Sequence, residues 1–323
     1  MSSNSQPVQP VQSWRPEPTT HGAAALEGFV VTGANGLVGS RVVARLAEAG
    51  EKVVAVGRGD ARFDHQIDYR SMDLAQPGQL RALLESVRPR VLVHCAAMTD
   101  VDACEADPVG AWLLNVRAVE AAALGCRSTG TRLVALSTDY VFDGLASGPY
   151  AEDDAPNPRG VYAATKRIGE ETALLLAPGC AVARVAVIYS GRRGVKRTFA
   201  VSAAESLRKG VQVKAFHDQV VSPTLADNAA EMVIGLARSP ASGIFHCSGA
   251  TPVSRVEFCR ALARKLGADE SLVVPVSLAD LKLPAPRPLR CGLRVEKIQR
   301  LLGEGAPLSL EAGLDRFLQE LSG

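Results

Sequence analysis

The 323-residue sequence has almost no excess of charge of either sign and no long apolar run. Its 36 Lys and Arg residues nearly balance 34 Asp and Glu residues, which gives a formal net charge of +2. A balance of interspersed charges provides no electrostatic basis for binding nucleic acid or an anionic membrane surface. No apolar stretch approaches the roughly 20 residues that span a bilayer, and the polar, proline-containing start lacks the pattern of a signal peptide. We therefore expect neither a nucleic-acid partner nor a membrane segment.

Clustered cysteines are also missing. The seven cysteines are scattered and never form a C-x-x-C pair, whereas a disulfide framework or a zinc site needs clustering. None of the 5 histidines has a second His or Cys at metal-ligand spacing. These absences favour reduced thiols and a cytoplasmic protein, and no metal site is expected.

What the sequence does contain is an alternation of short apolar runs and longer helical patterns from Gly28 onward. Strands that are apolar on both sides, alternating with helices, indicate a parallel sheet covered on both faces. We predict an α/β fold: a tail over residues 1–27, a doubly wound parallel sheet (Rossmann fold) over 28–190 with a return segment at about 218–248, and a smaller C-terminal α/β substrate lobe. That lobe comprises residues 191–217 and 249–323. The expected strands are 29–31, 53–56, 91–95, 133–137 and 181–188, and the expected helices are 37–49, 79–87, 111–124, 162–176 and 226–236.

A glycine-rich loop joins the first expected strand to the first expected helix. Its three glycines let the turn close, let the backbone approach a pyrophosphate, and let helix and strand pack closely. The free N–H groups at the start of the helix then face the phosphates. This pattern predicts a dinucleotide site, and the alternative is a tight turn without a ligand. The loop residues expected to line the cofactor are Gly33, Asn35, Gly36, Leu37 and Gly39.

The second expected strand ends at Gly57-Arg58-Gly59-Asp60. A carboxylate here binds the ribose hydroxyls of NAD, whereas an arginine accommodates the 2′-phosphate of NADP. Arg58 favours NADPH, and NADH is the alternative because Asp60 is close by. If no cofactor binds here, Arg58 is a solvated surface residue. Asp73, with Leu74 beside it, is placed to accept from the adenine amino group, although a helix cap explains Asp73 equally well.

Two further segments carry groups suited to proton transfer. Thr138 lies at the end of a strand, where doubly wound sheets place their ligands. Tyr162 and Lys166 are four residues apart at the start of a helix, so both can reach one ligand. A nearby ammonium lowers the pKa of a phenol from its usual value of about 10. The pair can then protonate a carbonyl oxygen while a hydride arrives at the carbon; the alternative is a surface tyrosine beside a solvated lysine.

These motifs resemble the extended short-chain dehydrogenase/reductase family. Stretches at His94–Thr99, Val101–Glu105, Ser137–Gly144 and Asp218–Thr224 resemble more narrowly the dTDP-4-dehydrorhamnose reductases. The likeness covers residues from about 28 to 303. It implies NADPH-dependent reduction of a 4-keto group on a deoxyhexose carried by a nucleoside diphosphate.

The resemblance also assigns roles to individual residues. It implies a catalytic set of Thr138, Tyr162 and Lys166, with Tyr162 and Lys166 also at the cofactor. Asn115 matches an asparagine that positions the lysine, although a polar residue on a helix face is an equal alternative. The remaining cofactor residues implied are Ala96, Ala97 and Met98, and the substrate residues are Thr99, Asp139, Tyr140, Val141, Gln219 and Arg287.

Departures from the family pattern leave alternatives open. His94 and Cys95 stand before the Ala-Ala pair, and the run also resembles the regulatory beta subunit of methionine adenosyltransferase, which binds a catalytic partner. Cys291–Arg294 replaces the usual sequence after the Arg-Pro pair, so the sugar is undetermined. A reductase of another carbonyl compound in specialised metabolism and a non-catalytic regulatory subunit are the rival hypotheses. A homodimer is expected by likeness to the family, and Arg287 and Arg290 are the expected pyrophosphate ligands.

Overall fold

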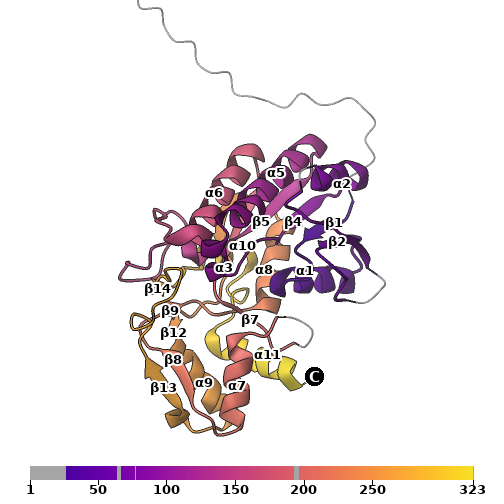
Figure 1. Ribbon diagram of the computed structural model, residues 1–323. Coiled ribbons are helices and arrows are strands. Elements are labelled where there is room, and N and C mark those ends of the chain that lie inside the picture. Colours follow the sequence, from indigo (N-terminus) through magenta and orange to yellow (C-terminus); the bar gives the residue numbers. More distant parts are fainter. Residues whose placement is uncertain (1–26, 64–66, 77, 193–195, 323) are drawn as a thin grey trace, which may run out of the picture.

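A parallel sheet with helices on both faces lies above a smaller lobe in the computed structural model, which describes residues 27–63, 67–76, 78–192 and 196–322 (Figure 1). The predicted tail, except for Glu27, lies outside the described residues.

The sheet contains seven strands in the order β11-β6-β5-β4-β1-β2-β3, and every neighbouring pair is parallel. The chain runs outward from β1 in one direction and then restarts at β4 on its other side. This reversal creates a crevice at the carboxyl ends of β1 and β4, where doubly wound sheets bind ligands. The strands are β1 (Phe29–Thr32), β2 (Val53–Gly57), β3 (Asp68–Ser71), β4 (Val91–His94), β5 (Arg132–Thr138), β6 (Ala181–Val185) and β11 (Gly243–His246).

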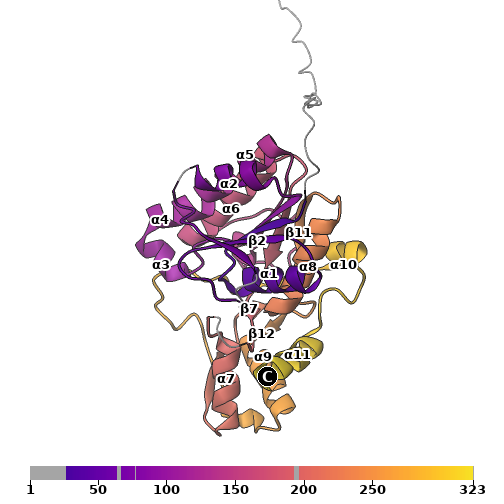
Figure 2. The same ribbon diagram turned by 90° about the vertical axis from the view of Figure 1, so that its right-hand side faces the viewer.

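Two helical layers cover the sheet because its central strands are apolar on both faces. In β1, Phe29 and Val31 pack into one core and Val30 into the other. One layer holds α1 (Leu37–Glu48), α8 (Ala226–Arg238) and α10 (Glu296–Leu302). The opposite layer holds α2 (Gln79–Val87), α5 (Ala118–Thr129) and α6 (Gly160–Leu176), above the strands in Figure 2. The predicted doubly wound α/β class is confirmed.

The helix predicted over 111–124 is divided. The chain forms α3 (Val101–Ala106), α4 (Pro108–Trp112), a π-helical turn (Leu113–Arg117) and then α5. The stretch Pro108–Thr129 is long and apolar enough to cross a membrane by length and composition alone. Half of its most apolar window is buried, and α5 packs between α2 and α6, as a core helix of a globular domain does.

The lobe is built around its own hydrophobic core. The strand predicted over 181–188 breaks after Val185, and Val187 adopts a φ of 37°, which is unusual for a β-branched residue. The chain thereby leaves the sheet for the lobe. The lobe contains β7 (Ile188–Tyr189), α7 (Phe199–Arg208), β8 (Val213–Phe216), β9 (Val220–Val221), β10 (Thr224–Leu225), β12 (Val253–Ser254), α9 (Arg255–Leu266), a short 3₁₀ turn (Glu270–Leu272), β13 (Val273–Val276), β14 (Arg290–Cys291) and α11 (Leu310–Ser322). A second 3₁₀ turn, Asp139–Val141, directly follows the sheet strand β5.

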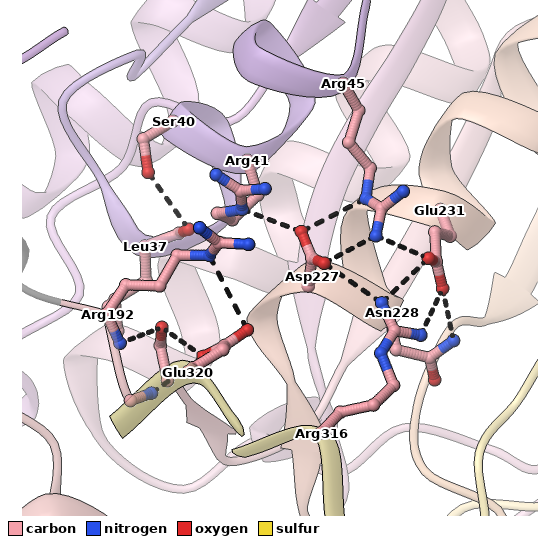
Figure 3. Close-up of polar contacts among 12 residues, drawn as sticks. Leu37, Ser40, Arg41, Arg45, Arg192, Asp227, Asn228, Glu231, Arg316 and Glu320 are labelled. Atoms are coloured by element: carbon pink, nitrogen blue, oxygen red, sulfur yellow. Dashed lines mark hydrogen bonds and ion pairs between the residues drawn. The ribbon is translucent and has the colours of Figure 1, made fainter. Parts of the chain in front are cut away.

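One part of the predicted lobe belongs to the sheet instead. Helix α10, within the predicted 249–323 segment, packs against α8 and β11 because Ile298 joins the core beneath the sheet. An ion-pair network then connects this body to the lobe (Figure 3). Asp227 of α8 accepts hydrogen bonds from Arg41 of α1 at 2.7 Å and from Arg316 of α11 at 2.9 Å. The glycine-loop helix is therefore fixed to the C-terminal helix.

Candidate active site

A cavity of about 810 Å³ opens at the carboxyl ends of β1, β4 and β5 and extends to the lobe. Its walls come from the glycine loop and the start of α1, the end of β2, the start of α6, and residues of α7 and α9. Segments far apart in the sequence therefore contribute to one site, at the crevice that the strand order creates.

The glycine loop has the form that a pyrophosphate needs. Gly33 has a φ of 65°, and a Cβ there would lie 2.7 Å from the backbone nitrogen of Ala96. A Cβ on Gly39 would collide with the carbonyl oxygen of Gly33. No side chain caps the start of α1, so its first N–H groups are available to an anion. Gly33, Asn35, Gly36, Leu37 and Gly39 all line the cavity, as the loop pattern predicts. These residues fit a dinucleotide cofactor.

The side chain of Asn35 holds the loop after β2 by hydrogen bonds to its backbone. Its side-chain nitrogen donates to the backbone oxygens of Arg58 and Asp60 at 3.1 and 3.0 Å, and its oxygen accepts from the backbone nitrogen of Arg62 at 3.2 Å. The exposed side chains of Arg58 and Arg62 then lie at the cavity, whereas Asp60 is not among the residues that line it. Sequence reasoning missed Arg62, because only the Asn35 contacts bring this loop residue back to the site.

Asp73 and Leu74 line the same end of the cavity. Asp73 Oδ1 also accepts from the backbone nitrogen of Ala75 at 3.1 Å, which is a local turn contact. The helix-cap alternative is wrong, because α2 begins at Gln79 with Gly78 as its N-cap residue. The position of Asp73 in the cavity lining is compatible with the predicted cofactor contact.

Thr138, Tyr162 and Lys166 line the cavity at the end of β5 and on α6, three strands along the sheet from Arg58, which follows β2. Thr138 and Lys166 are each 5% exposed and Tyr162 is 9% exposed. The Lys166 ammonium donates to the carbonyl oxygen of Leu136 at 2.7 Å. The surface alternative for this pair is therefore wrong: all three groups lie on the buried wall of one pocket.

The expected lowering of the Tyr162 pKa is not found in the protein alone. Burial raises the pKa of Tyr162 above its ordinary value and outweighs the opposing hydrogen bond from Thr138. Burial likewise lowers the pKa of Lys166 to about 8, against the opposing charge of Glu170. The phenol is consequently protonated near neutral pH, and the ammonium is held on Leu136. Tyr162 thus carries a proton available for donation.

Asn115 lies in the π-helical turn and is fully buried. Its side chain accepts from the nitrogen of Met98 at 2.8 Å and donates to the oxygen of Met98 and the hydroxyl of Thr165, each at 3.1 Å. It therefore fastens the segment after β4 to the residue preceding Lys166. Ala96 and Ala97 line the cavity, but the Met98 side chain packs against Cys104 and is not part of its lining.

The expected substrate residues divide into two groups. Thr99, Asp139 and Tyr140 line the cavity, and the ring of Tyr140 packs edge-on against Tyr162 at 5.7 Å. Val141 does not, because it is fully buried in a separate apolar cluster with Phe142.

Arg287 is also displaced from the expected role. Its guanidinium makes a two-pronged ion pair with Asp102 at 2.7 and 2.8 Å, which holds the C-terminal segment on α3. Arg290 does not line the cavity either. Gln219, also expected at the substrate, does not line the cavity. It is buried and accepts a hydrogen bond from Nε of Arg255 at 3.3 Å, and Arg255 lies at the cavity.

The cationic groups on the lobe side are ones that sequence reasoning missed. Lys196, Arg197 and Arg255 line the cavity, together with the aromatic rings of Phe199 and Phe258. Arg197 is paired with Glu205 at 2.6 Å. Arg255 lies over the ring of Phe199 at 5.3 Å. Nothing in their local sequence distinguishes them, since the packing of the lobe against the sheet brings them to the same cavity as Tyr162.

A glycine loop for phosphates and a buried Thr-Tyr-Lys set sharing one pocket define an extended short-chain dehydrogenase/reductase architecture. The chain belongs to the family described as RmlD substrate binding domain, whose model matches residues 28–322. The predicted family resemblance is confirmed.

Individual relatives agree with this assignment. The chain is 38% identical to a Streptomyces antibioticus protein described as a probable dTDP-4,6-dihydroxy-2-methyloxan-3-one 4-ketoreductase, over 80% of this chain and 84% of the relative. It is 33% identical to Xenopus tropicalis methionine adenosyltransferase 2 subunit beta, over 86% and 84%. Among solved structures, the dTDP-4-dehydrorhamnose reductase of Bacillus anthracis in complex with NADP matches with a TM-score of 0.80 and 26% identity, over 92% of this chain and 100% of that one.

Proposed function

We propose that this chain is an NADPH-dependent reductase of a 4-keto-6-deoxy sugar carried by a nucleoside diphosphate, with Tyr162 as the proton donor. The observation that carries the proposal is the position of Thr138, Tyr162 and Lys166 on the wall of the cavity that also holds the glycine loop. The relatives named as ketoreductase and dehydrorhamnose reductase support the reaction class.

The mechanism assigns one task to each buried group. When bound, the reduced nicotinamide supplies a hydride to the carbonyl carbon. The Tyr162 hydroxyl donates its proton to the carbonyl oxygen, and the Thr138 hydroxyl orients that oxygen by a hydrogen bond. The Lys166 ammonium stabilises the phenolate that Tyr162 becomes, since an opposite charge nearby favours the ionised form.

The two ends of the cavity suit the two ligands. The uncapped start of α1 and the guanidinium groups of Arg58 and Arg62 suit the phosphates of NADPH. At the lobe end, Lys196 and Arg255 suit a diphosphate, and the ring of Phe199 suits a nucleobase. These lobe residues replace Arg287 and Arg290 in the proposed recognition of the substrate.

The direct test is consumption of NADPH with a dTDP-4-keto-6-deoxy sugar, followed by product analysis. We expect turnover with the nucleotide sugar and none with the free sugar, because the cationic lobe residues then have no diphosphate to bind. Equal turnover of simple ketones that carry no phosphate would favour the rival reductase of another carbonyl compound.

A regulatory subunit is the second candidate, favoured by the likeness to methionine adenosyltransferase 2 subunit beta. This hypothesis predicts NADPH binding without turnover of any nucleotide sugar. It also predicts a stable complex with a methionine adenosyltransferase, measurable by analytical ultracentrifugation of the two purified proteins. Turnover without complex formation would exclude it.

Arg58 provides a test of cofactor choice. We expect Arg58→Ala to weaken NADPH binding about tenfold, the effect of losing one charge-assisted hydrogen bond at an exposed site. NADH binding should be unchanged because NADH lacks the 2′-phosphate. Cofactor fluorescence titration measures both. The matched control is Arg70→Ala, since Arg70 is exposed nearby but pairs with Asp68. An equal loss for NADPH and NADH would contradict the 2′-phosphate role.

We further propose a cytoplasmic location, supported by seven cysteines that are all unpaired. The homodimer stays a prediction, which the molar mass in solution tests.

A further inference from the structure

A buried carboxyl group lies beside the proposed proton donor. Asp139 is 2% exposed, lines the cavity, and its Oδ2 atom has no hydrogen-bond partner among the described residues. Its Oδ1 atom accepts a hydrogen bond from the Thr138 hydroxyl at 3.1 Å. The Thr138 hydroxyl and the Tyr162 phenol line the same cavity, and hydrogen bonding by Thr138 opposes the effect of burial on the pKa of Tyr162. A chain of three adjoining groups therefore connects the phenol to a carboxyl group on the pocket wall.

Other polar groups near Tyr162 are committed elsewhere. Asn115 uses both ends of its amide on Met98 and Thr165. Lys166 donates to the Leu136 carbonyl. The Thr138 hydroxyl accepts from the backbone nitrogen of Tyr140 at 3.2 Å, and it differs from these two groups in that it contacts a carboxyl group on the pocket wall.

We propose that Asp139 is the acid that returns a proton to Tyr162 through the Thr138 hydroxyl, an inference that rests on the reductase function proposed above. Once the substrate oxygen has taken the phenol proton, the Tyr162 phenolate takes the hydroxyl proton of Thr138. Thr138 takes the carboxyl proton of Asp139 in the same movement. Solvent in the pocket then reprotonates the Asp139 carboxylate after the alcohol product leaves. Each turnover consumes one hydride and one proton, which balances the reduction of a ketone to an alcohol.

The surroundings of Asp139 suit this role. Burial raises its pKa to about 7, against the hydrogen bond from Thr138 and the charge of Arg255 on α9. The other titratable groups that face it are Tyr140 on its own turn, Tyr162 on α6 and Cys291 on β14, and burial raises the pKa of each. These three groups are uncharged near neutrality, so Arg255 is the only formal charge among the groups named. The carboxyl group therefore exchanges its proton in the neutral range.

The test is the pH profile of Asp139→Asn, which keeps the size of the side chain and an acceptor for Thr138 but removes the acid. We expect kcat to fall about 100-fold at neutral pH, which is the lower end of the rate contribution of one general acid–base group. KM and NADPH binding should change little. In the native chain kcat should decline as pH rises through about 7, because the relay needs the protonated carboxyl. This decline should vanish in Asp139→Asn and persist in Asp139→Glu. Asp143→Asn is the matched control, since Asp143 is hydrogen-bonded to Tyr150 and does not line the cavity.

A second measurement does not depend on turnover. Infrared spectroscopy of the NADP-bound protein should contain a protonated-carboxyl band that titrates in the neutral range and is lost in Asp139→Asn. Absence of that band, or a neutral pH decline that survives Asp139→Asn, would overturn the relay. If no nucleotide sugar is reduced, the proposed function fails by that result, and the infrared titration decides on the acid separately.

Discussion

Replacing Tyr162 with phenylalanine should lower kcat about 1,000-fold, because the substitution removes the proposed proton donor and leaves its ring in place. Because the phenol is buried, solvent does not readily take its place as the proton donor. Burial also keeps the pKa of Tyr162 above the ordinary value, so the native hydroxyl holds its proton. Steady-state NADPH oxidation with a dTDP-4-keto-6-deoxy sugar measures the loss. NADPH affinity should stay within about twofold, since the phosphate contacts lie at the other end of the cavity.

The control is Tyr150→Phe. Tyr150 is also buried, but its hydroxyl donates to Asp143 at 2.7 Å and it does not line the cavity. We expect this variant to retain most of its activity. Substantial turnover by Tyr162→Phe would mean that another group donates the proton.

Replacing Asp227 with alanine should destabilise the fold by about 3 kcal/mol, the order expected for removing one partner of a buried ion pair. Asp227 is 4% exposed and accepts hydrogen bonds from Arg41, Arg45 and Arg316 (Figure 3). Its loss leaves three guanidinium groups close together with Glu231 as their remaining neighbouring acid. Urea unfolding followed by circular dichroism measures the change.

The matched control is Asp315→Ala on α11, next to Arg316. The Asp315 side chain is 60% exposed and pairs with Lys265. Exposed pairs contribute about 0–1 kcal/mol, so this variant should unfold close to the native chain. Equal losses from the two variants would contradict the importance of the network.

The pH dependence of this stabilisation has a definite sign. Burial alone would raise the pKa of Asp227, but the hydrogen bonds and charges of Arg45 and Arg41 prevail and hold it well below its ordinary value. A carboxyl with a lowered folded-state pKa contributes its stability above its unfolded pKa of about 3.9 and loses it as pH falls further. The difference between the native chain and Asp227→Ala should therefore shrink in acid.

The dinucleotide half of the site could be predicted from the sequence because it is local. The strand, the three glycines and the helix lie within Phe29–Glu48, so spacing alone places the cofactor residues on one turn. The Tyr162–Lys166 pair is local for the same reason, since four residues make about one helical turn. The doubly wound parallel class followed from the alternation of apolar strands and helices, whereas the order of the strands came from the structure.

Contacts between distant segments could not be predicted in this way. Arg287 was expected at the substrate, yet Asp102 on α3 holds it, because the C-terminal segment folds back over the start of α6. Val141 follows Tyr140 directly, but the 3₁₀ turn directs the two side chains to different places, one at the cavity and one in the core. Arg62 and Arg255 line the site through contacts with residues distant in the chain, Arg62 with Asn35, and Arg255 with Gln219 and Phe199.

The sequence by itself determined the fold class, the cofactor loop and the residues that we propose for proton transfer, since each depends on residues close together in the chain. Only the tertiary structure decided which cations of the lobe line the cavity, because the lobe comes from a distant part of the chain. It also decided the protonation of the site: the sequence indicated that an ammonium would lower the Tyr162 pKa, whereas burial raises it. Burial depends on every element packed around a group, so a local sequence pattern does not predict how burial shifts the pKa of that group.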